Sequence, residues 1–124
     1  METGREREGT VYLYIGQNEL LDEERIVGVF DIDKCTSGPR GREYLHRAEA
    51  EGTALDVSGD LPRSFVVCTH PYHEQVVYLS QLNPATLKRR WEQGELWESE
   101  AEGRIRKRKP KWETGSGGLS SGNR

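Results

Sequence analysis

Arginine and lysine side chains are the residues in this sequence with the most readily assigned chemistry. Lys88, Arg89 and Arg90 adjoin, while Arg25 and Arg63 each stand directly before a β-rich apolar run. A guanidinium group donates several coplanar hydrogen bonds, so it pairs with two phosphate oxygens or with the edge of a guanine. Arginines mounted on rigid elements could therefore both position and read DNA, although a single arginine is more often ordinary solvated charge.

The overall charge argues against DNA binding, but its distribution does not. The chain has 124 residues and a formal net charge of -3, whereas compact DNA-binding domains are commonly basic. The cations are clustered, and a second basic run follows the first, with members Arg104, Arg106, Lys107, Arg108, Lys109 and Lys111. This run could be a non-specific electrostatic arm or a charged tail that serves solubility.

Cys68, His70 and His73 fall within six residues and could in principle hold a metal ion. Sulfur and imidazole ligands at such spacing suit zinc. Residues 70–74 are predicted to form a turn, however, and no fourth ligand is evident. We therefore expect no bound metal.

Catalysis is also not expected. Asp31 and Asp33 could place two carboxylates on one side of a strand end, but acids at such a position more often cap the strand or the following loop. The sequence contains no phosphate-binding loop, no dinucleotide-binding loop and no nucleophile elbow. We therefore expect a protein without enzymatic activity and without a cofactor.

The strands and helices predicted around the arginines indicate an α+β fold. Alternating or continuous apolar runs predict strands over residues 10–15, 19–22, 25–32, 54–57, 63–69 and 75–80. The run 25–32 has few polar positions and is predicted to be a central strand buried on both faces. The last two runs are predicted to form a hairpin.

Two helices are expected beside a small, mostly antiparallel sheet. Residues 42–51 predict one central helix that Gly52 ends, after a loop over residues 35–41. Asn83 as N-cap and Pro84 at the first helical position predict a short C-terminal helix that continues to about Gln93.

One domain over residues 10–93 is expected, between a disordered segment 1–9 and a flexible tail 94–124 that is first charged and then rich in glycine and serine. We expect disorder beyond about Glu102. So small a unit commonly gains stability by oligomerising. Cys35 and Cys68 are not expected to form a disulfide, and the absence of a signal-peptide pattern and of an apolar run of about 20 residues predicts a cytoplasmic protein.

Five pieces of the sequence between Thr10 and Arg90 resemble, in order and spacing, the RemA/RemB family of bacterial extracellular-matrix regulators, and they are closer to RemB. These pieces are I-G-Q-N, E-R-I-V-G-V-F, the helix ending E-A-E-G, R-S-F-V-V, and Y-L-S-Q-L-N-P-A-T-L-K-R-R. The resemblance covers about two-thirds of the chain. It implies a fold like the LytTR DNA-binding domain, assembled into rings of subunits that contact double-stranded DNA through arginines.

Carried onto this sequence, the family's DNA-contacting arginines fall on Arg25 and Arg63, and the expected site also includes Lys88, Arg89 and Arg90. RemA-like sequences have two basic residues after a turn glycine, but here Asp60 and Leu61 follow Gly59. The resemblance implies a homo-oligomeric DNA-binding transcription regulator of the biofilm class, with no membrane and no small-molecule substrate. The alternative is a protein-interaction module of the same fold that has lost DNA binding.

Overall fold

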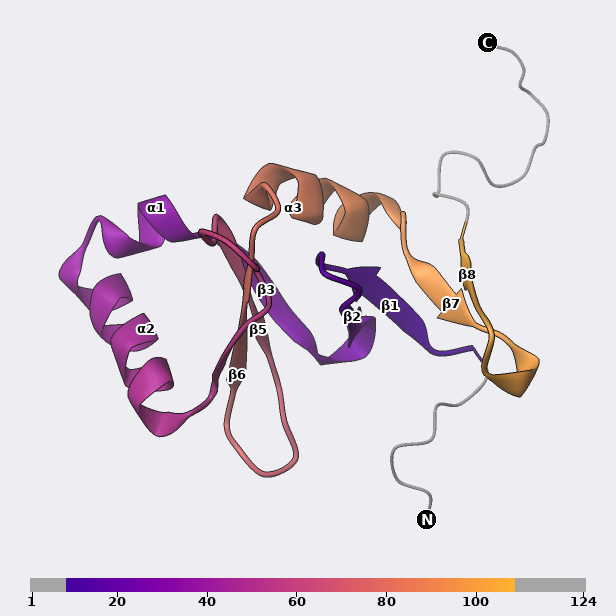
Figure 1. The fold of residues 1–124 in the computed structure, drawn as a ribbon, viewed down its shortest axis with the longest axis horizontal. Coiled ribbons are helices and arrows are strands. Elements are labelled where there is room, and N and C mark those ends of the chain that lie inside the picture. The colour runs from indigo at the N-terminus through magenta and orange to yellow at the C-terminus, as the bar shows by residue number, and fades with distance from the viewer. Residues whose placement is uncertain (1–8, 109–124) are drawn as a thin grey trace, which may run out of the picture.

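The computed structural model describes residues 9–108 (Figure 1), which form an α+β arrangement. The strands are β1 (Val11–Tyr14), β2 (Leu20–Asp22), β3 (Ile26–Asp31), β4 (Ala54–Asp56), β5 (Ser64–Cys68), β6 (Val76–Ser80), β7 (Trp97–Ser99) and β8 (Ile105–Lys107). The helices are α1 (Ile32–Thr36), α2 (Pro39–Glu51) and α3 (Pro84–Gln93), with single 3-10 turns η1 (Glu23–Arg25) and η2 (Ala101–Gly103). The predicted disordered segment 1–9 lies outside the described residues except for Gly9.

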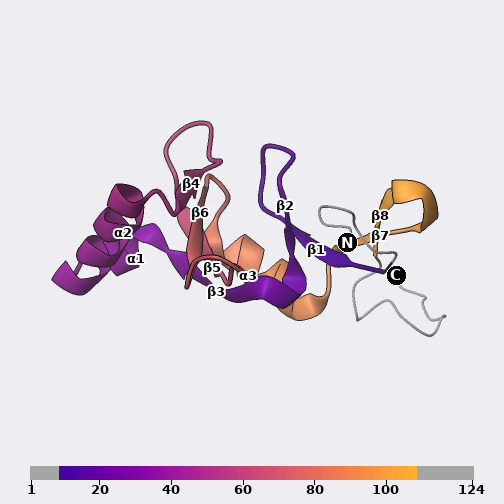
Figure 2. The same cartoon turned by 90° about the horizontal axis from the view of Figure 1, so that it is seen from below.

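The strands form two four-stranded sheets, where the sequence predicted one (Figures 1 and 2). One sheet has the order β2-β1-β7-β8, and the other has the order β3-β5-β6-β4. Only β4 and β6 are parallel, and every other pairing among the described strands is antiparallel. The predicted α+β class and its mostly antiparallel pairing are therefore confirmed.

The first sheet corrects the prediction of a flexible tail from residue 94 and of disorder beyond Glu102. β7 pairs with β1, with Trp97 opposite Tyr12, and β8 pairs with β7. The segment after Gly94 is predicted to be a tail because its residues are mostly charged and include no long apolar run. It nevertheless forms strands up to Lys107, since β7 pairs with β1 and buries Ser99 next to the buried Leu96, and the exposed β8 is held by its pairing with β7. The Gly/Ser-rich part of the predicted tail lies outside the described residues.

The prediction that residues 25–32 form a central strand buried on both faces is wrong. β3 is an edge strand, and the side chains of Val27 and Phe30 are 52% and 41% exposed. The two interior strands of this sheet are β5 and β6, and all five residues of β5 are buried. An apolar run shows that a strand is favoured, but it does not show whether a neighbouring strand covers its second edge.

The segment predicted as a loop over residues 35–41 is mostly helical. The carboxylate of Asp31 accepts hydrogen bonds from the backbone N–H groups of Asp33 and Lys34 and so caps α1. α2 begins at Pro39, three residues before the predicted start, and Gly52 ends it in the left-handed conformation as predicted.

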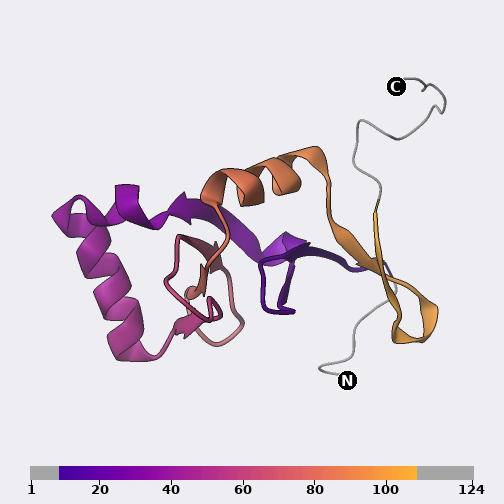
Figure 3. The same cartoon turned by 45° about the horizontal axis from the view of Figure 1, so that its top comes forward.

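The prediction for α3 is confirmed. Asn83 accepts a hydrogen bond from the Ala85 N–H at 2.8 Å, Pro84 takes the first position, and Gly94 ends the helix with φ 76°. Figure 3 shows α3 running from the β3-β5-β6-β4 sheet toward β7. The helix therefore connects the two sheets.

Two apolar clusters cover the two faces of the β3-β5-β6-β4 sheet. The first, shared with β1, β2 and α3, contains Leu13, Ile15, Leu21, Val29, Val66, Cys68, Leu87 and Leu96. The second, under α2, contains Ala48, Phe65, Val67, Val77 and Leu79. Cys35 packs against the second cluster while Cys68 belongs to the first, so the two free thiols lie on opposite faces of the sheet.

Candidate nucleic-acid interface

Arg25 is exposed, and its backbone is fixed at the start of β3. It is the last residue of η1, a turn in which the Asp22 carboxylate accepts a hydrogen bond from the Glu24 N–H at 3.0 Å. The carbonyl of Arg25 accepts a hydrogen bond from the Thr69 N–H at 2.9 Å. This bond ties Arg25 to the end of β5 from which the β5–β6 hairpin turn departs.

Arg63 is also exposed and is fixed more firmly. Its N–H donates to the Ser80 carbonyl at 2.8 Å, and its own carbonyl accepts from the Ile32 N–H at 3.2 Å. Arg63 therefore lies between the ends of β3 and β6, directly before β5.

The two arginines lie at opposite ends of the same strand pair. In the β3–β5 register Ile26 is opposite Cys68 and Asp31 is opposite Ser64. Arg25 is next to Thr69, and Thr69 and Arg63 are six residues apart along β5, which corresponds to about 20 Å at the rise of a strand. A single chain therefore does not bring these two predicted site residues together.

The three cationic residues of α3 that were predicted to bind DNA differ in exposure and in ion pairing. Lys88 is exposed and Arg90 is half-buried, on either side of a helix face that buries Leu87. Arg89 donates from Nη1 to the Glu95 carboxylate at 2.8 Å, so its charge is largely neutralised. The α3 cluster contributes less positive charge than its sequence indicates.

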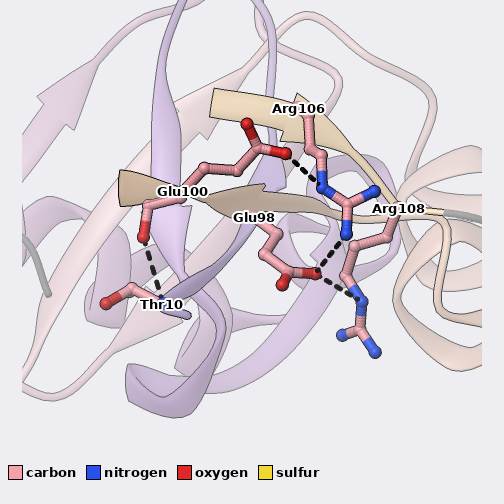
Figure 4. Close-up of polar contacts among 6 residues, drawn as sticks. Thr10, Glu98, Glu100, Arg106 and Arg108 are labelled. Carbon is pink, nitrogen blue, oxygen red and sulfur yellow. Dashed lines mark hydrogen bonds and ion pairs between the residues drawn. The ribbon is translucent and has the colours of Figure 1, made fainter. Parts of the chain in front are cut away.

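The second basic run forms one strand of a hairpin held by ion pairs (Figure 4). Arg106 contacts Glu100 at 2.6 Å and Glu98 at 3.9 Å, and Arg108 contacts Glu98 at 3.3 Å. The alternation of glutamates at 98 and 100 with arginines at 106 and 108 is the signal that could have predicted this pairing. Up to residue 108 this run is therefore not a free cationic arm, and Lys109 and Lys111 lie outside the described residues.

Arg25 and Arg63 differ from the arginines that are bound to acids. Within residues 9–108, arginine–carboxylate ion pairs involve Arg47, Arg89, Arg106 and Arg108. Neither Arg25 nor Arg63 has such a pair within that range. Their guanidinium groups are therefore available to an external anion.

The candidate catalytic carboxylate Asp31 and the candidate metal ligands His70 and His73 have nearby contacts within the chain. Asp31 caps α1, as described above, so its carboxylate has a structural partner. His70 and His73 are neighbours in the hairpin turn with ring centroids 5.0 Å apart. Within the part of the chain that the structure describes, no group of three His, Cys, Asp or Glu side chains could hold a metal ion.

An apolar groove beside β3 is a surface feature that sequence reasoning missed. Its volume is about 240 Å³, and its lining residues are Val27, Phe30, Cys35, Tyr44, Phe65, Val67 and Gln75. The rings of Phe30 and Phe65 stack with centroids 5.2 Å apart. The groove exists because α2 does not cover the outer edge of β3 on this face.

Burial of Cys68 predicts a loss of stability at alkaline pH. Desolvation raises the pKa of its thiol from 9.0 to about 11, while Arg25 lowers this pKa and Asp22 raises it to a smaller extent. Above about pH 9 the unfolded chain loses this proton while the folded chain keeps it, so the free energy of unfolding falls as pH rises toward 11. Chemical denaturation at pH 8, 9, 10 and 11 measures this slope.

The Cys68→Ala variant is the control for this prediction. Its free energy of unfolding is lower at neutral pH because of the cavity, but its decline between pH 9 and 11 is expected to be shallower than that of the wild type. Part of the decline persists because burial also raises the pKa of Tyr78. Equal slopes in the two proteins would contradict the assignment to Cys68.

Comparisons with known proteins add no assignment to this geometry. Neither the models of known protein families nor the curated proteins match this chain. Among the helices of residues 9–108, none has the length and apolar character needed to cross a membrane.

Proposed function

We propose that this chain is a non-catalytic, cytoplasmic, oligomeric DNA-binding protein that regulates transcription, as the resemblance to extracellular-matrix regulators implies. The single observation that carries the proposal is the pair of exposed arginines, Arg25 and Arg63, on hydrogen-bonded backbone and without a carboxylate partner in residues 9–108. Lys88 and Arg90 add positive charge on α3.

The rigidity of the two arginine positions supports a role in binding. An arginine whose backbone is already ordered loses only side-chain freedom when it binds a phosphate, so more of the interaction energy appears as affinity. The planar guanidinium then engages two phosphate oxygens or a guanine edge. Each phosphate neutralised in this way releases counterions, which makes the affinity fall with rising salt.

Acidic residues near Arg25 and Arg63 weaken the attraction of a single subunit for DNA. Glu23 and Glu24 precede Arg25 in the same turn, and Asp60 lies three residues before Arg63. Because the chain as a whole carries a net charge of -3, a single subunit has little attraction for DNA. Repetition of the arginines in an assembly supplies the missing affinity, since linked binding sites act at a high effective concentration.

The proposal predicts that removing the two arginines weakens DNA binding and its salt dependence. Arg63→Ala is expected to weaken binding to a promoter-length duplex about tenfold, and the Arg25→Ala, Arg63→Ala double variant about a hundredfold, because each charge-assisted hydrogen bond contributes about 1.5 to 3 kcal/mol. For every phosphate that an arginine no longer neutralises, the slope of log affinity against log salt is expected to decrease by about 0.9. Fluorescence anisotropy between about 50 and 200 mM salt measures both quantities.

Arg47→Ala is the matched control. Arg47 is an exposed arginine on α2 that pairs with Glu43 at 3.6 Å, so its removal changes the net charge by the same amount without touching the proposed site. If Arg47→Ala and Arg63→Ala weaken binding equally, the effect is non-specific charge. If the wild type ignores DNA even at about 50 mM salt, the proposal is wrong.

A protein-interaction module is the second candidate, and the apolar groove beside β3 favours it. A groove of this kind suits an apolar side chain of another polypeptide, and Leu61 is a further exposed apolar residue, at 79%. DNA binding that is absent at low salt, together with a stable complex through the groove, would support this candidate.

A further inference from the structure

We propose that a pocket beside Arg25 binds a small basic α-amino acid, and that the bound amino acid withdraws Arg25 from DNA. This Arg25 pocket lies between β2, η1 and the hairpin that joins β5 to β6, and it is lined by residues 19–22, Arg25, residues 68–71 and Tyr78. Binding of the amino acid does not depend on DNA. Its effect on DNA binding rests on the proposed function.

The size and lining of the Arg25 pocket suit a molecule as small as an amino acid. Its volume is about 310 Å³, at the small end of the range of about 300 to 1,000 Å³ for ligand pockets. Part of the lining is apolar and comes from Leu21, Cys68 and Pro71. Such a lining can bury a methylene chain that separates two polar ends.

The charged side chains of the pocket lining, those of Glu19, Asp22 and Arg25, do not neutralise one another. None of the three takes part in an ion pair within residues 9–108. Burial is the main reason that the pKa values of Cys68 and Tyr78 are raised, but Arg25 lowers both pKa values, while Asp22 raises that of Cys68 and Glu19 raises that of Tyr78. All three charges therefore act on the same space.

The sum of these charges indicates the class of ligand. The lining carries two carboxylates and one guanidinium, and Glu23 and Glu24 of η1 add negative charge nearby. A small anion such as phosphate is disfavoured by this net negative potential. A ligand with two cationic groups and one carboxylate matches every charge of the lining, and a basic α-amino acid has this composition.

The positions of the charges match the layout of such a ligand. Asp22 and Arg25 flank the same turn, and both act on Cys68, so they suit an α-ammonium and an α-carboxylate that share one carbon. Glu19 is three residues before Asp22 across β2, about 10 Å between Cα atoms, and suits the distal cation. The backbone of Glu19 is fixed by hydrogen bonds with Ile15 at 3.0 Å and Gly16 at 2.9 Å.

His70 provides a second donor for the carboxylate of the ligand. Its Nδ1 accepts a hydrogen bond from the Tyr72 N–H at 3.1 Å, so the neutral ring carries its proton on Nε2. His70 follows Thr69, whose N–H donates to the carbonyl of Arg25. A carboxylate that binds the guanidinium of Arg25 takes the paired N–H groups that a phosphate would use, and it neutralises their charge. The amino acid and DNA therefore compete for Arg25.

Titrations with three related probes, followed by protein NMR spectra, test the site. L-Lysine is expected to bind with a Kd of about 1 mM and to shift the amide signals of Leu21 and Thr69. Cadaverine lacks the carboxylate of L-lysine, and L-norleucine lacks its distal ammonium group. Each is expected to bind about tenfold more weakly or worse, because one charge-assisted hydrogen bond is lost.

Two variants assign the ligand groups to their partners. Arg25→Ala is expected to weaken L-lysine about tenfold without weakening cadaverine, and Glu19→Gln is expected to weaken L-lysine about tenfold without weakening L-norleucine. Glu49→Gln is the matched control, because Glu49 is an exposed acid on α2 outside the pocket, and it should bind L-lysine like the wild type. Far-UV circular dichroism establishes that each variant is folded.

Fluorescence anisotropy with a DNA duplex tests the competition. With about 10 mM L-lysine the DNA affinity of the wild type is expected to fall about fivefold, and that of Glu19→Gln less than twofold at the same ionic strength. Arg25→Ala is expected to show no such fall.

The outcomes separate this inference from the proposed function. The site is overturned if L-lysine gives no saturable shift up to about 20 mM, or if cadaverine or L-norleucine binds as tightly as L-lysine. DNA affinity that stays unchanged when the pocket is occupied overturns the competition. A wild type that binds L-lysine but ignores DNA overturns only the proposed function.

Discussion

The Leu87→Ala variant is expected to lower the free energy of unfolding by about 3 to 5 kcal/mol, the upper part of the range for buried leucines. Leu87 is 0% exposed and belongs to the cluster that joins residues from both sheets. Its side chain projects from α3 onto a surface formed by β1, β3 and β5, so neither sheet can close the cavity without moving relative to the other. Urea denaturation followed by circular dichroism measures the change.

Leu55→Ala provides the comparison for this prediction. It removes the same atoms from a partly exposed position on β4, so its cost is expected to stay below about 1 kcal/mol. A Leu87→Ala variant that loses no more stability than Leu55→Ala would mean that α3 is not packed between the sheets. A domain of this size has about 5 to 15 kcal/mol of stability in all, so the expected loss is a large part of it.

Gly41→Ala is expected to destabilise the protein by about 3 kcal/mol, although alanine is the better helix former by about 1 kcal/mol. A Cβ atom at position 41 would clash with the backbone carbonyl oxygen of Cys35 and would lie 2.6 Å from its Sγ atom. The carbonyl belongs to α1, so it cannot rotate away as a flexible side chain would. The two helices would have to separate.

The control for Gly41→Ala is Arg40→Ala on the same turn of α2. Arg40 is exposed, so this substitution should change stability by less than about 0.5 kcal/mol. Thermal unfolding of both variants distinguishes the two expectations. A more stable Gly41→Ala protein would show that the close approach of α1 and α2 does not occur in solution.

The sequence predicts those elements best whose signals are local. Asn83 and Pro84 predict the start of α3 because capping and the fixed φ of proline depend on neighbours in the chain. Gly52 predicts the end of α2 for a similar reason. The buried strand β5 and its hairpin with β6 also follow from the apolar residues on either side of a polar turn.

The features that sequence reasoning missed depend on which segments meet in space. Val27 and Phe30 are as apolar as the residues of β5, and only the sheet order shows that no described strand covers them. β7 and β8 are three-residue strands in a charged part of the sequence. β7 is stabilised by pairing with β1, and β8 by pairing with β7 and by ion pairs of Arg106 and Arg108 with Glu98 and Glu100. The separation of the two candidate site residues could not be predicted either, because the positions of Arg25 and Arg63 at opposite ends of the sheet follow from the antiparallel register of β3 and β5.

The placement of the two cysteines gives the unmodified protein one thiol with which to observe the β3 groove. Cys35 is partly exposed and lines the groove, whereas Cys68 is buried on the other face with a raised pKa and stays protonated at neutral pH. Since only a thiolate reacts with maleimides at an appreciable rate, labelling of the folded chain reports on Cys35 alone. The rate at which this thiol reacts therefore measures, at any protein concentration, the fraction of molecules whose groove is open to solvent.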